Sequence, residues 1–287
     1  MPLISVIIPF YSKIQGLLKN SVSSALNQSV HDIEVIVVDD CSPVSAVDEL
    51  ADIKDERLKV VKHSKNQHGG IARNTGVKEA EGKFIAFLDY DDVWYANKLQ
   101  KQYELFISEG NEHNSKAVVY SKCKIIDGKR EFTRPRRKIE HSERVGDYLF
   151  CAQEIIQTSG LFLTRELALL TPFDNLKRHQ DYQFCLALEA AGAKFVLLDE
   201  IVYDFIQIPK QIDYNFALSW LESYKQLLSA DAVKGFKYLV VIRAMISAKD
   251  YRKAMMFSYR NKLLLLFFKA LIKRAARLTL KQLKVVK

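Results

Sequence analysis

The chain has 287 residues, of which 48% are hydrophobic, with eleven Gly and six Pro; it can bury a sizeable core and leaves little room for disordered linkers. Its four cysteines lie far apart, with no Cys-x-x-Cys pair and no His at zinc-ligand spacing, which favours reduced thiols in a cytoplasmic protein. Eleven of the 43 basic residues fall between Arg252 and Lys287, so the rest of the chain is nearly neutral and we expect no nucleic-acid partner.

The first sixty residues alternate strand-like and helix-like segments. Residues 5–8 are a β-branched run that Pro9 ends, and apolar residues from Ile14 to Leu26 recur on one face of a helix. A second strand is expected over 34–38, a short helix over 43–51 and a third strand over 58–61. This alternation predicts a parallel, doubly wound sheet with right-handed crossovers.

A polar loop over 63–82 contains Gly69 and Gly70 and leads into a helix expected to begin near Ile71. Glycines permit a close backbone approach, and a helix start offers free N–H groups, so the loop suits a phosphate-bearing ligand. The alternative is an ordinary Gly-Gly turn before a helix, with Arg73 in solvent.

The apolar run 84–88 predicts a central strand covered on both faces, and it stops at Asp89, Asp91 and Asp92. Ligands of open α/β sheets bind outside the carboxyl ends of the strands. Two acids in Asp-x-Asp can share one hard cation that also contacts phosphate oxygens. Asp-x-Asp alone also occurs in surface turns.

Further elements are expected along the second half of the chain. A helix is expected from Tyr95 to Phe106, a strand over 117–120 and a hairpin at Asp127-Gly128. The basic cluster 133–138 is either a solvated loop or a contact for an anionic acceptor. Later segments are a helix with Tyr182, Leu186 and Ala190 on one face, strands over 195–198 and 201–205, and helices from Ile212 onward.

Four motifs in order, Ile-Ile-Pro-Phe-Tyr at 7–11, Val-Val-Asp-Asp at 37–40, the glycine segment at 66–76 and Phe-Leu-Asp-Tyr-Asp-Asp at 87–92, cover about the first hundred residues. In order and spacing they resemble the nucleotide-sugar-binding half of family 2 glycosyltransferases with the GT-A fold. The resemblance implies an α/β, Rossmann-like, mostly parallel sheet flanked by helices. It implies a catalytic domain over 1–210, divided into a nucleotide-sugar half (1–100) and an acceptor half (101–210), before a C-terminal helical region (211–287).

The resemblance also implies roles for single residues. Asp39 matches the acid that reads the uracil edge, and Asp91 matches the ligand of Mg²⁺ or Mn²⁺, with Asp89 nearer the ribose but sharing the metal site. The other implied donor-binding residues are Pro9, Tyr11, Asn66, Gly70 and Arg73. Asp40 and Asp92 are weaker candidates, since each could cap the next element. The chain departs from the family at 41–45, where Gly-Ser-x-Asp is often found.

Asp181 matches the catalytic base of the family, although Gln180-Asp181 replaces the usual Glu-Asp. A metal stabilises the departing diphosphate. Asp181, as general base, removes the proton of the acceptor hydroxyl, and attack from the opposite face inverts the anomeric carbon. The alternative for Asp181 is a helix N-cap. We expect His179 to shape the site rather than to bind metal.

The tail over 260–287 alternates apolar and basic residues without acids, as in a helix that lies on an anionic membrane surface. The alternative is a packing helix with a charged outer face. We see no signal peptide and no charge-free membrane span. These features favour a peripheral protein on the cytoplasmic face of the cell membrane.

Three functions of different class remain. The first is a metal-dependent, inverting hexosyl- or N-acetylhexosaminyltransferase that uses a UDP-sugar. Its acceptor would be a saccharide, either free or lipid-linked, in cell-surface polysaccharide or lipopolysaccharide biosynthesis. The second is a sugar-phosphate nucleotidyltransferase, which the lack of a Gly-rich, Lys- and Arg-bearing N-terminal loop disfavours. The third is a membrane-docked module that binds nucleotide sugars without turnover.

Overall fold

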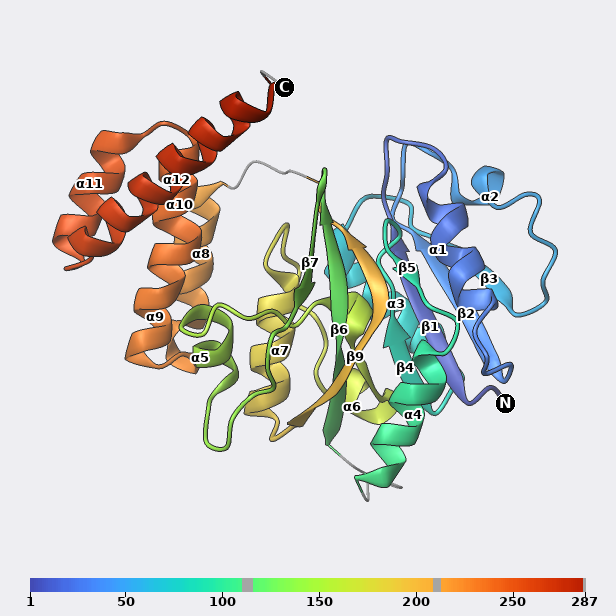
Figure 1. The fold of residues 1–287 in the computed structure, drawn as a ribbon. Helices are drawn as coiled ribbons and strands as arrows, with labels where there is room; N and C mark the ends of the chain where they lie inside the picture. Colours follow the sequence, from blue (N-terminus) through green and yellow to red (C-terminus); the bar gives the residue numbers. More distant parts are fainter. Residues whose placement is uncertain (110–115, 209–212, 286–287) are drawn as a thin grey trace. The chain divides into compact units, whose positions relative to one another are not determined.

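The computed structural model describes residues 1–109, 116–208 and 213–285, and it divides into two compact units (Figure 1). The first unit comprises Met1–Val145 and Glu154–Ile208. The second comprises Gly146–Gln153 and Pro209–Lys287. The second unit therefore recruits a short segment that lies within the first unit along the chain.

The first four strands of the first unit form a parallel sheet in the order β3-β2-β1-β4. Their bounds are β1 Ile4–Phe10, β2 Ile33–Asp39, β3 Leu58–Lys62 and β4 Phe84–Phe87. The prediction that Pro9 ends β1 was wrong. Pairing with β4 stops at Ile7, opposite Phe87, so the missing N–H of Pro9 removes no hydrogen bond to that strand.

The rest of the sheet is mixed, so the expectation of a mostly parallel sheet is correct for β3-β2-β1-β4 but not for the strands beyond β4. Here β8 is antiparallel to β4 and β6, β9 is parallel to β6, and β5 is antiparallel to β9. The bounds are β5 Val93–Trp94, β6 Ala117–Asp127, β7 Arg130–Arg134, β8 Phe162–Thr164 and β9 Lys194–Ile206. The β6–β7 hairpin turns at Gly128, as predicted.

The two strands predicted over 195–198 and 201–205 are one strand, β9. Successive residues Ser121 and Lys122 of β6 pair with Leu198 and Ile201 of β9. Asp199 and Glu200 are therefore accommodated as a bulge inside a continuous strand, and both are exposed. The sequence pattern broke at these two acids, but the backbone pairing did not.

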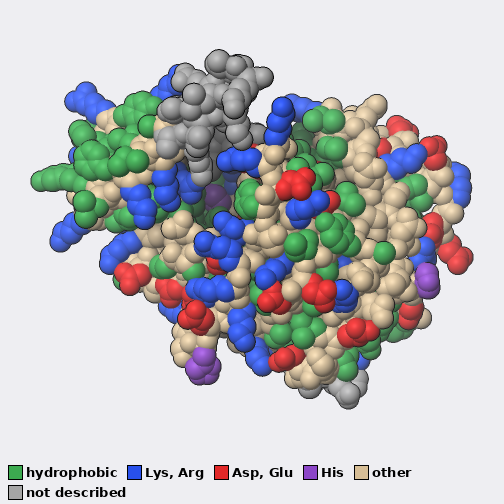
Figure 2. Space-filling model, viewed as in Figure 1, with side chains coloured by type: hydrophobic (Ala, Val, Ile, Leu, Met, Phe, Trp, Pro, Cys, Tyr) green, Lys and Arg blue, Asp and Glu red, His purple; other side chains and the backbone are tan. Residues whose placement is uncertain are grey.

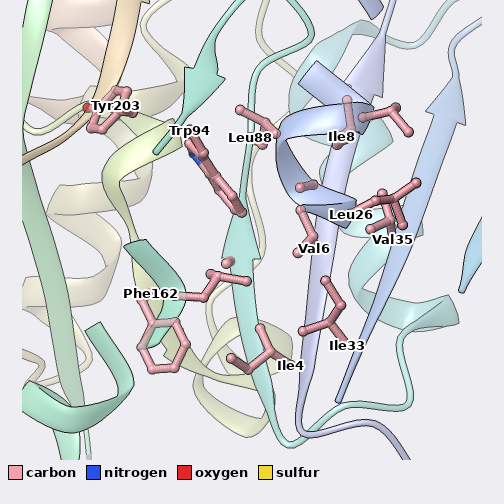
Figure 3. Close-up of a cluster of buried hydrophobic side chains, with 14 of the residues drawn as sticks. Ile4, Val6, Ile8, Leu26, Ile33, Val35, Leu88, Trp94, Phe162 and Tyr203 are labelled. Carbon is pink, nitrogen blue, oxygen red and sulfur yellow. The ribbon is translucent and has the colours of Figure 1, made fainter. Parts of the chain in front are cut away.

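Helices cover both faces of the sheet. Side chains of β1 alternate, so Ile4, Val6 and Ile8 pack on the α1 side (Figure 3), whereas Ile7 contacts Gly76 of α3. The first face carries α1 Leu17–Leu26, α2 Ala46–Glu49 and α4 Lys98–Ser108. The second carries α3 His68–Glu79, α6 Arg165–Leu170 and α7 Gln180–Ala190.

Several predicted helix boundaries and faces were wrong. α1 begins at Leu17, which leaves Ile14 exposed in the preceding loop, and α2 spans only four residues. Tyr95 precedes α4, and Ala190 is exposed on α7. Caps and contacts with other elements set these limits, as where the Ser45 side chain caps α2.

The described part of the second unit is helical, and its core is aromatic. Trp220 stacks on Phe236 with ring centroids 4.9 Å apart, and Phe150 meets Phe236 edge to face at 5.1 Å. The elements are α5 Val145–Phe150, α8 Tyr214–Tyr224, the 3₁₀ turn Lys225–Leu227, α9 Ala230–Phe236, the π-helical segment Lys237–Ile242, α10 Arg243–Ser247, α11 Tyr251–Arg260 and α12 Leu264–Val285. Within the described ranges, every helix is too short or too polar to cross a bilayer.

Candidate active site

Two acidic sequences lie at the same edge of the sheet. β2 ends at Asp39, followed by Asp40, and β4 is followed by Asp89 and its neighbours. Both strands pair in parallel with β1, which lies between them, so their carboxyl ends point the same way. Such an edge is the usual ligand site of α/β sheets.

Asp39 is buried, and both of its carboxylate oxygens accept backbone hydrogen bonds. Oδ1 accepts from the Ser42 N–H at 2.7 Å, and Oδ2 accepts from the Ala46 N–H at 3.1 Å. The Ser42 hydroxyl oxygen in turn accepts a hydrogen bond of 2.9 Å from the backbone N–H of Ser12. Asp39 thus shapes the 41–45 loop, and Ser42 connects that loop to the segment that carries Tyr11, whose side chain is 42% exposed.

Asp40 is also buried and organises the loop before α3. Its carboxylate lies 2.7 Å from Nδ1 of His63 and accepts the Gln67 N–H at 2.9 Å. The other ring nitrogen of His63 lies 2.9 Å from the Thr75 hydroxyl. Asn66, a predicted donor-binding residue, donates its amide to the Asp40 backbone carbonyl at 3.2 Å. Asp40 therefore connects the end of β2 to the loop before α3, and both of these segments carry predicted site residues.

Asp89 contacts residues from two distant parts of the chain. It forms an ion pair with Arg73 of α3. It also accepts hydrogen bonds from Gln157 Nε2 and the Thr158 hydroxyl, each at 3.2 Å, and its backbone N–H donates to the Ser159 hydroxyl at 2.9 Å. The 3₁₀ turn η1 Thr158–Gly160 therefore fixes the Asp89 carboxylate together with Arg73 of α3.

Asp92 is fully buried and closes the bend that contains Asp91. It accepts from the Ser159 hydroxyl at 2.6 Å and from the Ile206 N–H at 3.2 Å. Burial raises the pKa of Asp92 well above its ordinary value, and the negative charges of Asp89 and Asp91 add to this. Its neutral form is favoured, so Asp92 serves as a structural tie between β4, η1 and β9.

Asp91 lies between these two anchored acids and is partly buried. The hydroxyl of Ser21 on α1 contacts the carbonyl oxygens of Tyr90 and Asp92, both at 2.7 Å, which fixes the backbone on either side. Across the described ranges, no three His, Cys, Asp or Glu side chains are grouped as a complete protein metal site. Two adjacent carboxylates nevertheless fit an ion such as Mg²⁺, which takes one or two carboxylates plus substrate phosphates.

Arg73 connects α3 to the first residue of α7 and to the segment that precedes α7. Its guanidinium donates to Oε1 of Gln180 at 2.9 Å and lies 5.4 Å from the centroid of the Phe173 ring. A Cβ on Gly70 would lie 2.7 Å from the carbonyl oxygen of Asp174. The glycines therefore permit α3 to pack against residues 173–180, and α3 begins at His68 rather than near Ile71. The solvated alternative for Arg73 was wrong, because the side chain is buried.

Asp181 is the second residue of α7, whose N-cap position is His179 in a left-handed conformation (φ 59°). The N-cap alternative for Asp181 was therefore wrong. Burial raises the pKa of Asp181 to about 6; the Tyr182 backbone N–H opposes this rise and the Asp89 charge adds to it. A carboxylate with that pKa suits a general base near neutral pH. Burial lowers the pKa of the adjacent His179 to about 4, so its ring is neutral there.

The supporting role of Gln157, Thr158 and Ser159 was missed from the sequence, which offered only polar residues before an apolar run. The indole N–H of Trp94 donates to the Ser159 carbonyl at 3.0 Å. The buried Lys98 ammonium lies 3.8 Å from the centroid of the Trp94 ring. Trp94 therefore supports η1. The position of this aromatic residue after the acids was the only feature of the sequence that indicated the support.

Two arginines of the basic cluster 133–138 form ion pairs within the first unit. Arg136 bonds Glu154 at 2.7 Å, and Arg137 bonds Glu143 through two contacts of 2.7 Å. Both arginines retain exposed surface. The cluster is therefore held in place by acids rather than simply solvated, and its contact with an acceptor stays a prediction.

The family model for glycosyl transferase family 2 matches residues 5–167, which include both acidic strand ends and η1. The chain belongs to this family. It is 28% identical over 269 residues to the amylovoran biosynthesis glycosyltransferase AmsB of Erwinia amylovora, covering 88% of each chain. It is 39% identical over 109 residues to the succinoglycan biosynthesis protein ExoW of Rhizobium meliloti, covering 36% of this chain and 34% of that protein.

The fold is shared with a solved glycosyltransferase structure. The match to S. aureus TarS residues 1–349, crystallised with UDP-GlcNAc, has a TM-score of 0.59 at 21% identity. It covers 97% of this chain and 92% of that one. At this identity the likeness shows the GT-A type of α/β fold, with a mixed sheet flanked by helices.

Proposed function

We propose that this chain transfers a hexosyl or N-acetylhexosaminyl group from a UDP-sugar to a saccharide acceptor, with inversion at the anomeric carbon. The observation that carries the proposal is the convergence of Arg73, Asp89 and Gln180 beside Asp181. Arg73 bonds both Asp89 and Gln180. Arg73 thereby joins the candidate donor-binding acid Asp89 to Gln180, the residue that directly precedes the candidate base Asp181 in the sequence.

The donor half of the site would bind the nucleotide at the β2 and β4 ends. Pro9 and Tyr11 would line the base, and Asp39 would accept from the uracil edge with the lone pairs that its two backbone bonds leave. Asn66, Gly70 and Arg73 would approach the diphosphate from α3 and its preceding loop. Asp89 would contact the ribose side.

In the acceptor half, Asp181 would accept the proton of the acceptor hydroxyl as its oxygen attacks the anomeric carbon. The bond from that carbon to the diphosphate oxygen breaks, and UDP leaves on the face opposite the attack. A pKa of about 6 keeps Asp181 largely ionised at neutral pH but close to the operating range of a base. Asp92 would keep the bend rigid without adding a second full charge.

Asp91, together with Asp89, would hold Mg²⁺ or Mn²⁺. When bound, such an ion neutralises negative charge that develops on the leaving diphosphate. Because Arg73 already balances Asp89, Asp91 is the better candidate for direct contact. Two carboxylates without a third protein ligand suit an ion whose remaining ligands are phosphates and water.

For the setting, we propose biosynthesis of a cell-surface polysaccharide or lipopolysaccharide at the cytoplasmic face of a membrane, with a lipid-linked saccharide as acceptor. The names of two relatives, which refer to amylovoran and succinoglycan biosynthesis, support the polysaccharide part. The segment from Tyr251 to Lys287, which contains no Asp or Glu, supports peripheral contact with anionic lipid. The proposed extents are residues 1–210 for catalysis and 211–287 for this contact.

Calorimetric titration of the full chain with UDP and with GDP, each with and without Mn²⁺, tests the donor half. We expect UDP to bind more tightly than GDP and to need the metal. If the folded protein bound neither nucleotide, we would conclude that this family member does not bind a nucleotide-sugar donor. Pyrophosphate release from a nucleoside triphosphate and a sugar phosphate would instead favour a nucleotidyltransferase. UDP binding without turnover on any lipid-linked saccharide would favour the non-catalytic module.

A further inference from the structure

The second unit exposes large apolar side chains on two consecutive helices. Tyr259 of α11 is 72% exposed, and Leu265 and Ile272 of α12 are 85% and 69% exposed. We name these side chains together the α11–α12 apolar surface: Tyr251, Met255, Met256, Tyr259, Leu265, Phe268 and Ile272. Such a gathering of exposed large side chains on a soluble chain marks an interaction site.

α12 has apolar residues on two opposite sides. Phe267 and Ala270 are buried against the second unit, and the Arg274 guanidinium bonds the Ile246 carbonyl at 2.6 Å on that same side. Leu265, Phe268 and Ile272 follow the spacing i, i+3 and i+7 and point away from it. The inner side already anchors the helix, so packing within the unit does not account for the outer side.

Basic side chains surround this surface. Figure 2 shows Lys and Arg around the apolar side chains over α11 and α12. From Tyr251 to the end the sequence contains no Asp or Glu. The exposed basic residues of this segment are Arg252, Lys253, Arg260, Lys262, Lys269 and Lys273. An apolar strip bordered by cations complements a layer of anionic headgroups over acyl chains.

We propose that the α11–α12 apolar surface inserts into the interface of an anionic phospholipid bilayer while the inner side of α12 stays packed on the second unit. The proposal rests on the proposed function for its cellular setting, and it narrows the membrane contact to seven named side chains. Insertion buries Leu265, Phe268 and Ile272 among acyl chains. Lys269 and Lys273, beside them on the helix, meet the headgroups.

A second copy of the chain is the less suitable occupant. In a two-fold dimer the same surface faces itself, so the six cations of one copy would meet the six of the other. Like charges at a desolvated interface oppose association. An anionic lipid surface provides the opposite charge that the described part of the tail lacks.

Co-sedimentation of the full chain with lipid vesicles tests the proposal. Vesicles of phosphatidylcholine alone are compared with vesicles that contain about 30% phosphatidylglycerol. We expect binding to the anionic vesicles that weakens with added salt, and little binding to the neutral ones. The combined variant Leu265→Gln, Phe268→Gln and Ile272→Gln should weaken binding by about tenfold or more, because it removes the inserted side chains.

The matched control replaces three exposed apolar residues of the first unit, as Leu169→Gln, Leu170→Gln and Ile201→Gln, and should bind vesicles as the wild type does. Equal binding by the two triple variants would overturn the proposal. So would a wild-type dimer in light scattering that the α12 variant converts to monomers, because the surface would then join two copies.

UDP titration of the same preparations separates this proposal from the proposed function. The α12 variant should bind UDP like the wild type while losing the vesicles. Loss of UDP binding in all proteins, with vesicle binding intact, would count against the donor site alone. Circular dichroism of the variant checks that α12 stays helical.

Discussion

The acids at the ends of β2 and β4 both follow an apolar run in the sequence, but their surroundings in the structure differ. At β2, Asp39 and Asp40 accept backbone N–H groups of Ser42, Ala46 and Gln67, so they define the loops. At β4, Asp89 contacts the side chains of Arg73, Gln157 and Thr158. Backbone partners tie a carboxylate to its loop and leave only its remaining lone pairs for a ligand, whereas side-chain partners can exchange for a ligand.

This difference predicts opposite consequences for the same substitution. Replacing Asp by Asn at position 40 should mainly cost stability, whereas the same replacement at position 91 or 181 should mainly cost activity. Asp40→Asn, Asp91→Asn and Asp181→Asn form a matched set, because each replaces one carboxylate oxygen by an NH₂ group of similar size and removes the negative charge.

The largest expected effect belongs to Asp181→Asn. Without a base, transfer from a UDP-sugar should fall by about 10²- to 10⁴-fold, while UDP affinity stays near that of the wild type. The measurement is turnover under saturating donor together with calorimetric binding of UDP. A variant that retains normal transfer would remove Asp181 from the mechanism.

The same substitution should raise stability. In the folded protein the pKa of Asp181 is about 6, above its ordinary value of 3.8. Ionisation of this buried carboxylate therefore lowers the free energy of unfolding as the pH rises from about 4 to 6. Above that range Asp181→Asn removes the cost and should stabilise the protein by about 1–3 kcal/mol. Urea unfolding at pH 7.5 measures it, and a loss of stability would contradict the assigned burial cost.

Asp91→Asn should weaken metal-dependent UDP binding by about 10- to 100-fold, since it removes the proposed direct ligand of the ion. Titration of UDP with and without Mn²⁺ measures this ratio. Binding in the absence of metal should change little, which separates a lost ligand from a distorted pocket. Equal metal-dependent gains in wild type and variant would exclude Asp91 as the ligand.

The sequence predicted β1 to β4 and the acids that follow β2 and β4, because an apolar run and its end are local features. It did not predict which acids are buried. Asp92 is closed off by Ser159 and Ile206, which lie far along the chain, and Gly70 approaches Asp174 in the same way. Local pattern gives the position of a carboxylate, but its partners depend on how remote segments meet.

The C-terminal tail shows the same limit. Its spacing predicts an amphipathic helix, yet a single strip of sequence does not indicate which apolar side packs inward. The contacts of Phe267 and Arg274 decide this for α12, and the exposed Leu265 and Ile272 follow. The predictions for residues 209–212 and 286–287, and for the side chains of 276–285, lie outside what the structure describes.

The dependence of rate on pH should be moderate and should follow Asp181. Only the ionised carboxylate accepts a proton, so kcat/KM should fall about tenfold for each pH unit below 6 and level off above it. Rates at saturating metal and donor, measured from about pH 5 to 8, give the profile. A profile that does not bend near pH 6 would assign the base to another group.

Asp40→Asn should have the smallest effect on catalysis and a clear effect on stability. The neutral amide binds the His63 ring and the Gln67 N–H less well, and a buried polar group left poorly paired costs about 1–3 kcal/mol. Urea unfolding should show that loss, while UDP affinity should change less than in Asp91→Asn. If Asp40→Asn lost UDP binding but kept its stability, Asp40 would bind ligand directly rather than support the loop before α3, and the contrast with Asp91 would fail.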